Sequence, residues 1–338
     1  MRFLVTGAAG YIGSHAALRL LEDGGEVIVV DSLLRGHAGA IAALRRVGGT
    51  RLTFVDADIR DTDRVARTLN THGVVDAVLH FAALTYVGES VERPAEYHSV
   101  NLDGGKSLLE AMRRTGVRRM LFSSTAATYG EPAPEEIPIT EATPQRPINP
   151  YGASKLAFEH ALREECAADP AFGAVALRYF NVAGADAHGR LGEDHRPETH
   201  LIPICLEVAL GKRSHLTVFG EDYPTHDGTC VRDYVHIEDL VEAHLLALGA
   251  LEPGRFRAWN VGIGRGHSVR EVIDICRRVT GHAIPTVSAP RRAGDPQVLY
   301  ADARAIERDL GFRPKKPALE TAVADLWRWM QANPRGYA

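Results

Sequence analysis

Residues 3–13 read FLVTGAAGYIG and are the strongest indication of the fold. Their apolar start, Phe3–Val5, is typical of a buried strand, and three glycines spaced G-x-x-G-x-x-G follow directly, before an amphipathic segment. Glycines at such a strand-to-helix turn let a pyrophosphate approach the free N–H groups at the start of the helix. The stretch therefore predicts a dinucleotide-binding turn, in which the phosphates meet Gly7, Gly10, Tyr11, Ile12 and Gly13.

Outward from this stretch, short apolar runs alternate with longer amphipathic segments. The runs rich in Val, Ile and Leu are typical of strands covered on both faces: Phe3–Val5, Val27–Val30, Leu52–Val55, Ala77–His80, Met120–Phe122 and Ala174–Leu177. The amphipathic segments have the periodicity of helices packed on a sheet: Ile12–Glu22, Ala38–Val47, Thr62–Asn70, Ala95–Arg114 and Pro150–Cys166. This order predicts an α/β fold with a doubly wound parallel (Rossmann) sheet, whose ligands bind beyond the carboxyl ends of the strands.

After Tyr179 the alternation loosens into a region rich in Gly, His, Pro and Asp, interrupted by the helix-like run Leu201–Leu210. Later strand-like and helix-like runs are Val231–His236, Trp259–Val261, Ser268–Val279 and Pro317–Met330. We therefore expect a Rossmann domain over residues 1–180, with a returning segment near 230–262, and a second, smaller α/β substrate domain over residues 181–338. The segment Glu131–Pro150 is the long loop of the chain and a candidate lid.

The composition bounds the function. The chain has 338 residues, of which 45% are hydrophobic and 24% charged, as in an ordinary soluble protein of about two domains. A net charge of −4 gives no cationic field for nucleic acid or an anionic membrane. The four cysteines form no C-x-x-C pair, and no window approaches 18 apolar residues. We expect a cytoplasmic protein with no nucleic-acid partner and no membrane partner.

Asp31 ends the second predicted strand, 18 residues after Gly13. A carboxylate at this place can accept hydrogen bonds from the adenosine ribose and would repel a 2′-phosphate, which favours NAD over NADP. A solvated strand-end carboxylate is the alternative. Asp58 and Ile59 follow the third predicted strand and can flank the adenine, although a plain turn explains them nearly as well.

A second constellation follows the fifth predicted strand, which ends in Ser123, Ser124 and Thr125. Asn149-Pro150 is typical of a helix start, so Tyr151 and Lys155, four residues apart, lie on one helical face. A phenol with a pKa of about 10 becomes a base at neutral pH when a lysine ammonium and an oxidised nicotinamide favour the phenolate. An ordinary helix tyrosine with an exposed lysine is the alternative, which the dinucleotide turn disfavours.

Together these residues resemble the extended short-chain dehydrogenase/reductase family. Further stretches match its UDP-sugar 4-epimerase members in order along almost the whole chain: His80–Ala83, Val87–Ser90, Arg178–Asn181, Gly192–Asp194, Phe219–Thr225, Asp227–Thr229, Val231–His236 and Arg291–Asp295. The resemblance implies a tightly held NAD, a UDP-sugar bound mainly by the C-terminal part, and a homodimer. The occurrence of all these stretches in one chain, in this order, is far more specific than any single match.

The resemblance also implies the roles of the catalytic residues. The Tyr151 phenolate removes the sugar 4-hydroxyl proton while hydride passes from C4 to NAD, Thr125 holds the same oxygen, and Lys155 bonds the nicotinamide ribose. The 4-keto sugar then takes the hydride back on its other face, so C4 is inverted without net oxidation. The expected reaction is the interconversion of UDP-glucose and UDP-galactose.

Further contacts are implied by the same resemblance. The additional cofactor contacts are Phe81, Ala82, Ala83, Asn101, Ser123 and Tyr179. The UDP-sugar contacts, besides Thr125 and Tyr151, are Asn181, the backbone of His200 and Leu201, Thr217, Phe219, Arg232, Arg292, Asp295 and Leu299. The two arginines suit a pyrophosphate. The intermediate bulk of Leu299 leaves UDP-N-acetylhexosamines and UDP-pentoses open as substrates.

Rival functions differ from this one in particular residues. Related dehydratases need an acid and a base directly after the threonine, where this chain has Ala126 and Ala127, and decarboxylating relatives need a glutamate in place of Ala127. A non-catalytic NAD-binding sensor would lack the tyrosine–lysine pair. An oxidoreductase with an exchangeable cofactor is the third alternative.

The chain also departs from the family pattern. Thr85 stands where many members have a lysine near the cofactor, Val100 replaces the first of two asparagines, and His200 replaces another. The histidines of the loop-rich region show neither H-E-x-x-H nor paired-ligand spacing, so the sequence predicts no functional metal site. These histidines are His188, His195, His200, His215 and His226.

Overall fold

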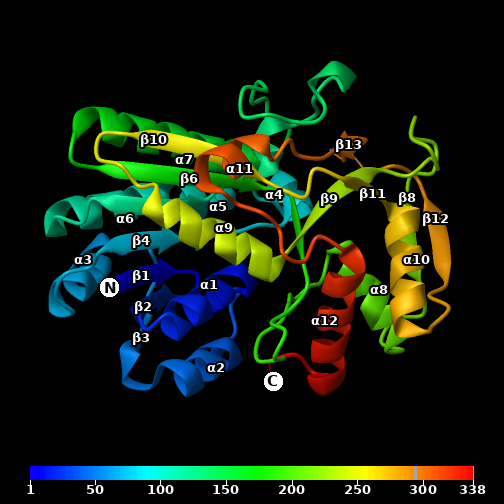
Figure 1. The fold of residues 1–338 in the computed structure, drawn as a ribbon, viewed down its shortest axis with the longest axis horizontal. Helices are drawn as coiled ribbons and strands as arrows, with labels where there is room; N and C mark the ends of the chain where they lie inside the picture. The colour runs from blue at the N-terminus through cyan, green and yellow to red at the C-terminus, as the bar shows by residue number, and fades with distance from the viewer. Residues whose placement is uncertain (293–294, 338) are drawn as a thin grey trace.

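The computed structural model describes residues 1–292 and 295–337. Seven parallel strands form its main sheet in the order β10-β6-β5-β4-β1-β2-β3 (Figure 1). The strands are β1 (Arg2–Thr6), β2 (Glu26–Asp31), β3 (Leu52–Asp56), β4 (Ala77–His80), β5 (Arg119–Ser123), β6 (Gly173–Tyr179) and β10 (Phe256–Val261). The predicted doubly wound Rossmann sheet is confirmed.

Helices cover both faces of this sheet. Successive strand residues point to opposite faces, so Val5 and Val29 pack into one core while Leu4 and Ile28 pack into the other. The first core is covered by α1 (Tyr11–Glu22), α2 (Ala38–Gly48) and α9 (Ile237–Gly249). The second core is covered by α3 (Thr62–Thr71), α6 (Gly104–Thr115) and α7 (Pro150–Ala168). The strand order reverses between β1 and β4, which opens a ligand crevice at their carboxyl ends.

The helix expected over Ala95–Arg114 is divided. The chain forms α5 (Pro94–Tyr97), a π-helical turn η2 (His98–Asp103) and then α6. Inside the π turn, the amide of Asn101 accepts a hydrogen bond from Leu84 N at 2.8 Å and donates to Ser154 Oγ at 3.0 Å. The single-helix prediction was wrong here because a regular apolar period does not reveal one wide turn, a feature that is frequent at functional sites.

The C-terminal half builds a smaller unit around a third core. The strands β7 (Asn181–Ala183), β9 (Val231–His236), β11 (Gly266–Ser268) and β13 (Val298–Leu299) form one sheet, and β8 (Leu216–Phe219) pairs with β12 (Thr286–Ala289). The helices are α8 (Leu201–Ala209), α10 (Val269–Thr280) and α12 (Leu319–Ala332), which Figure 1 shows together on one side of the molecule. Short helices also occur elsewhere in the described chain. In the first half they are η1 (Gly49–Arg51), α4 (Val87–Glu92), η3 (Ala126–Tyr129) and η4 (Pro134–Glu136), and in the second half α11 (Arg304–Leu310).

The chain crosses between the two units. Within the returning segment expected near residues 230–262, β10 pairs with β6 and α9 packs on α1, so both lie with the first sheet. β9 does not, because it pairs with β7, β11 and β13. The part of the return that belongs to the first sheet therefore begins at Ile237.

The segment Glu131–Pro150 is irregular apart from η4 and the first residue of α7, as expected for a loop. Ile139 is fully buried and forms a bridge with Ala301, and the Glu141 carboxylate accepts a hydrogen bond from Asn260 N at 2.7 Å. These contacts fasten the segment to β10 and to the chain at Ala301, so its structure does not support the expected lid. Across the described ranges, no helix is both long and apolar enough to span a membrane.

Candidate active site

The glycine turn joins β1 to α1 at the crevice. Gly7 has a φ of +75°, and a Cβ added to it would lie 2.5 Å from Ala82 N. A Cβ on Gly13 would lie 2.3 Å from Gly7 O, so both positions require glycine. Gly10 caps α1 without a side-chain hydrogen bond, which leaves N–H groups of the first turn for an anion. The turn has the shape and the donors that a pyrophosphate needs.

Asp31 lies at the end of β2, beside this turn. Its two carboxylate oxygens accept hydrogen bonds from Ala9 N at 2.9 Å and Leu33 N at 2.8 Å. Burial raises the pKa of Asp31, although these two N–H groups oppose the rise. The carboxylate is thus fixed in place and keeps lone pairs for ribose hydroxyls. Asp58, at the adjacent edge of the sheet, pairs with Arg60 at 2.6 Å.

The tyrosine–lysine pair lies on the first turns of α7. Asn149 caps this helix by accepting a hydrogen bond from Gly152 N at 2.8 Å, which sets where the helix begins. Lys155 Nζ donates to Ser123 O at 2.9 Å and lies 4.9 Å from the centre of the Phe122 ring. The helix therefore holds both side chains against the end of β5.

The electrostatics of the pair depend on burial. Burial lowers the pKa of Lys155 to about 7, although Glu159 opposes this, and burial raises the pKa of Tyr151 to about 12, although the Thr125 hydroxyl opposes that. A phenol with this pKa stays protonated at neutral pH. A positive charge beside the phenol would lower this pKa, because an opposite charge within a few ångströms favours the ionised form.

A buried hydrogen-bond network next to Tyr151 and Lys155 was not predicted from the sequence. Arg178 and Glu159, both almost fully buried, form an ion pair at 2.6 Å between β6 and α7. Arg178 also donates to Tyr129 Oη at 2.9 Å, and Ser124 donates its hydroxyl hydrogen to Glu159. The sequence offered Arg178 only as one letter of a matched stretch. The network ties α7 to the sheet and so fixes the pair in space.

One cavity of about 820 Å³ joins these features, and its size is ordinary for a small-molecule site. The lining includes all but one of the predicted cofactor residues: Gly7, Gly10, Tyr11, Ile12, Gly13, Asp31, Asp58, Ile59, Phe81, Ala82, Ala83, Ser123, Tyr151, Lys155 and Tyr179. The exception is Asn101, which lies behind the wall and holds Leu84 and Ser154 instead. Tyr86, Arg35 and His195 also line the cavity and were not predicted.

The other half of the same cavity carries the predicted substrate residues: Thr125, Asn181, His200, Leu201, Thr217, Phe219, Arg232, Arg292, Asp295 and Leu299. Phe219 is 42% exposed, and the Arg292 guanidinium lies 5.6 Å from the centre of its ring. Arg292 pairs with Asp295 at 2.9 Å. An open aromatic face with two arginines nearby suits a nucleobase and a diphosphate.

Residues that separate the rival reactions line the cavity too. Ala126 and Ala127 follow Thr125 in η3 and present methyl groups, which cannot move protons. Thr85 and Val100 also line it, so no cation stands at position 85. Tyr151 and Lys155 in the cavity wall can thus transfer a proton, and the two positions after the threonine lack the acid and base that dehydration needs.

A Rossmann sheet, an uncapped glycine turn and a buried tyrosine–lysine pair define a nucleotide-dependent enzyme of the short-chain dehydrogenase/reductase class. Comparison with known proteins narrows this class, because residues 3–262 match the NAD dependent epimerase/dehydratase family. The chain belongs to this family, as the resemblance implied, and NAD is its cofactor.

Individual relatives agree over their whole length. A UDP-glucose 4-epimerase of Halalkalibacterium halodurans is 50% identical, and the match covers 100% of this chain and 98% of that protein. A crystal structure of a UDP-glucose-4-epimerase from Stenotrophomonas maltophila, with bound NAD and formylated UDP-arabinopyranose, has a TM-score of 0.93 at 42% identity and 99% coverage of each chain. A UDP-Glc/GlcNAc 4-epimerase from Campylobacter jejuni has a TM-score of 0.83 at 41% identity, covering 98% of this chain and 99% of that one.

Proposed function

We propose that this chain inverts C4 of a UDP-sugar, with UDP-glucose and UDP-galactose as the leading pair. The observation that carries the proposal is that Tyr151 and Lys155 share one cavity with the glycine turn and with the aromatic–arginine face. The alanines at positions 126 and 127 support inversion over dehydration, because inversion asks for no further acid or base. The names of the full-length relatives support the same reaction.

The cofactor fits the residues of the first half of the cavity. The glycine turn would hold the pyrophosphate, Asp31 the adenosine ribose, and Asp58 and Ile59 the adenine. Bound NAD supplies a positively charged ring that can take hydride from the sugar and return it. This charge beside the Tyr151 phenol favours the phenolate, which the buried site disfavours when NAD is absent.

The residues of the chain then perform the remaining steps. Tyr151 accepts the proton of the sugar 4-hydroxyl, with Thr125 bonded to the same oxygen. Lys155 binds the nicotinamide ribose, and a phenolate nearby favours the charged form of this lysine, which burial disfavours in the cofactor-free chain. The ring of the resulting 4-keto sugar rotates within the cavity and presents its other face. After hydride has returned to C4 on that face, the proton returns from Tyr151 to the same oxygen. Asn181, Leu201, Arg232 and Arg292 hold the UDP group throughout.

The two halves of the chain divide this work. Residues 1–180, with the return through α9 and β10, bind NAD, and residues 181–338 bind the nucleotide sugar. We also propose a homodimer in the cytoplasm. Four cysteines without a disulfide support a reducing compartment, and the family resemblance supports the dimer. The molecular mass in solution tests the dimer directly.

Assay of the purified protein with UDP-galactose and no added NAD tests the reaction. Formation of UDP-glucose, with NAD retained and no NADH released, is the expected result. Release of up to one equivalent of NADH per bound NAD, without formation of UDP-glucose, would instead indicate a net oxidoreductase, and retained NAD without turnover of any UDP-sugar would indicate a sensor. Either result overturns the proposal.

A second substrate class has specific support. Leu299 is of intermediate bulk, and two structural relatives are named for or contain other sugars, an N-acetylglucosamine derivative and a formylated UDP-arabinopyranose. Competition among UDP-galactose, UDP-N-acetylgalactosamine and UDP-xylose ranks them by kcat/KM. A higher kcat/KM for either of the latter two would replace the hexose in the proposal without changing the chemistry.

A further inference from the structure

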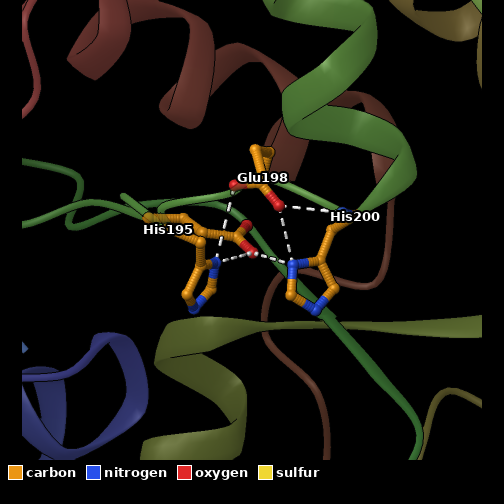
Figure 2. Close-up of side chains that lie close together, drawn as sticks. His195, Glu198 and His200 are labelled. Carbon is orange, nitrogen blue, oxygen red and sulfur yellow. Dashed lines mark hydrogen bonds and ion pairs between the residues drawn. The ribbon is translucent and has the colours of Figure 1, made fainter. Parts of the chain in front are cut away.

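Four metal-ligating side chains meet outside the catalytic pair. Glu193, His195, Glu198 and His200 lie in the irregular segment between β7 and α8, and one potential ligand atom from each lies within 4.8 Å of all the others. Figure 2 shows the rings of His195 and His200 directed toward the carboxylate of Glu198. The sequence spacing gave no sign of this cluster, because its members come from an irregular segment rather than from one helical face.

The separations of these atoms suit a small cation. Nδ1 of His195 lies 3.2 Å from Glu193 Oε1 and 3.5 Å from Glu198 Oε2. Nδ1 of His200 lies 3.1 Å from Glu193 Oε1 and 2.9 Å from Glu198 Oε1. Nitrogen and oxygen ligands about 2.0–2.2 Å from a tetrahedral zinc ion stand about 3.3 Å apart, within this range. Only small shifts would place an ion between the four.

Unpartnered polar atoms provide an independent observation. Glu193 is only 5% exposed, and its Oε1 is the oxygen that faces both imidazoles, while its Oε2 is buried without a hydrogen-bond partner among the described residues. His195 Nδ1 is likewise buried and forms no hydrogen bond, although two carboxylate oxygens surround it. In a simple ion pair the N–H would point at one oxygen. The nearest oxygens to this nitrogen, Glu193 Oε1 and Glu198 Oε2, lie 3.2 and 3.5 Å away, and neither forms a well-aligned hydrogen bond with it.

Backbone contacts hold one of the ligands in place. Glu198 Oε1 accepts hydrogen bonds from Thr199 N at 2.7 Å and His200 N at 2.8 Å. Ligating carboxylates and imidazoles are commonly oriented by such outer partners. The set is therefore pre-arranged by the chain itself and not assembled from mobile surface side chains.

We propose that Glu193, His195, Glu198 and His200 bind one divalent transition-metal ion, with zinc the best match to two imidazole nitrogens and two carboxylate oxygens. Four protein ligands close a tetrahedral site, so the ion has a structural role and does not take part in the reaction. It fastens the start of α8, where His200 is the cap and Leu201 the first residue. The His195 ring lies 6.3 Å from that of Tyr11, so the ion also braces the segment against the glycine turn.

Protonation of the two histidines is the alternative explanation of this cluster. Burial lowers the pKa of His195, but the neighbouring Glu193 and Glu198 outweigh it and raise the pKa to about 9. A pair of imidazolium–carboxylate contacts is thus the alternative to a metal ion. The two alternatives differ in a property that can be measured, because only the metal site gives coordination spectra and a fixed stoichiometry.

Cobalt titration of the tag-free, chelator-treated protein tests the proposal. We expect one Co²⁺ per chain, with the intense visible absorption bands of a four-coordinate ion, displacement of the cobalt by one equivalent of Zn²⁺, and a higher melting temperature with zinc. His195→Gln and Glu198→Gln should each lower the affinity by more than the 10–100-fold that loss of an outer partner costs. His188→Gln, an exposed histidine outside the cluster, is the matched control and should bind like the parent.

Three outcomes overturn the proposal. Cobalt that gives no four-coordinate bands would leave the cluster as an ion-pair network, and binding unchanged in both cluster variants would place the ion elsewhere. Zinc that binds without raising the melting temperature would remove the structural role. None of these readouts uses sugar turnover, so the metal site and the proposed reaction stand or fall separately.

Discussion

Tyr151 is the residue through which the proposed reaction moves a proton. Its replacement in Tyr151→Phe keeps the ring that packs in the cavity and removes the hydroxyl alone. We expect turnover to fall by about 10²–10⁴-fold, the usual contribution of a general base, while the NAD content of the purified protein stays the same. Rates with UDP-galactose and NAD released by denaturation measure the two effects.

Tyr223→Phe is the control for this change, because Tyr223 is also a buried tyrosine but does not line the cavity. Its turnover should match that of the parent. Undiminished turnover of Tyr151→Phe would assign the base to another residue.

Lys155 gives a prediction about pH. Burial lowers its pKa from 10.5 to about 7 in the folded, cofactor-free chain, so between these values the unfolded chain carries a proton that the folded chain has lost. The free energy of unfolding should therefore rise with pH through this window, by at most about 1.4 kcal/mol per pH unit from this residue. Lys155→Met removes the contribution.

Urea unfolding of the cofactor-free parent and of Lys155→Met, between pH 7 and 9.5, measures this effect. Below pH 10 the tyrosines of the unfolded chain contribute little. The stability of the parent relative to the variant should increase steadily over the range. A difference that stays constant with pH would mean that Lys155 keeps its charge in the folded chain, held by Ser123 O.

At the scale of elements, a buried ion pair helps to hold α7 against the sheet. Glu159→Gln leaves the Arg178 guanidinium buried without its carboxylate, which typically costs about 3–5 kcal/mol of stability. Because α7 also carries Tyr151 and Lys155, we expect turnover to fall as well. Urea unfolding at neutral pH measures the loss of stability.

Glu320→Gln is the matched control, because it breaks an ion pair with Arg278 whose side chains are 50% and 62% exposed. Exposed pairs contribute about 0–1 kcal/mol, so its unfolding midpoint should hardly move. Equal losses in the two variants would contradict the positioning role of the buried pair.

The elements also show what the sequence could reveal. Strands such as Val231–His236 were found at their observed bounds, because their apolar residues are local signals. The π turn around Asn101 was missed, since its width is set by contacts with Leu84 and Ser154 that no local pattern encodes. The Arg178–Glu159 pair was missed for the same reason, because its partners lie 19 residues apart on different elements.

At the scale of the whole molecule, the site is assembled from both halves of the chain. The glycine turn and the tyrosine–lysine pair were predicted from short motifs and the arginine face from the family resemblance, and the structure brings all three into one cavity. The cluster around His195 could not be predicted in this way, because its four members become neighbours only through the path of an irregular segment. Motifs identify the parts of a site, and the fold decides which parts meet.

We proposed that the first half of the chain binds NAD and the second half binds the nucleotide sugar. This proposal predicts that the affinities for the two ligands can be weakened separately. In Arg232→Gln we expect the dissociation constant for UDP to rise by about 10–100-fold, since a hydrogen bond to a charged group contributes about 1.5–3 kcal/mol, while the NAD content stays at the parent level. Asp31→Asn should lower the NAD content and leave the affinity for UDP unchanged. It removes the charge that favours the ribose hydroxyls but keeps a hydrogen-bond acceptor for Ala9 N.

Calorimetric titration with UDP and the amount of NAD released on denaturation measure the two affinities in the same preparations. Arg308→Gln, which changes an arginine that is 70% exposed and remote from the cavity, should leave both unchanged. Because Asp31 ends a strand of the first sheet and Arg232 lies on β9 of the second, we expect a defect at one position not to spread to the other. Loss of NAD in Arg232→Gln equal to its loss of UDP would show instead that the two halves bind their ligands as one unit.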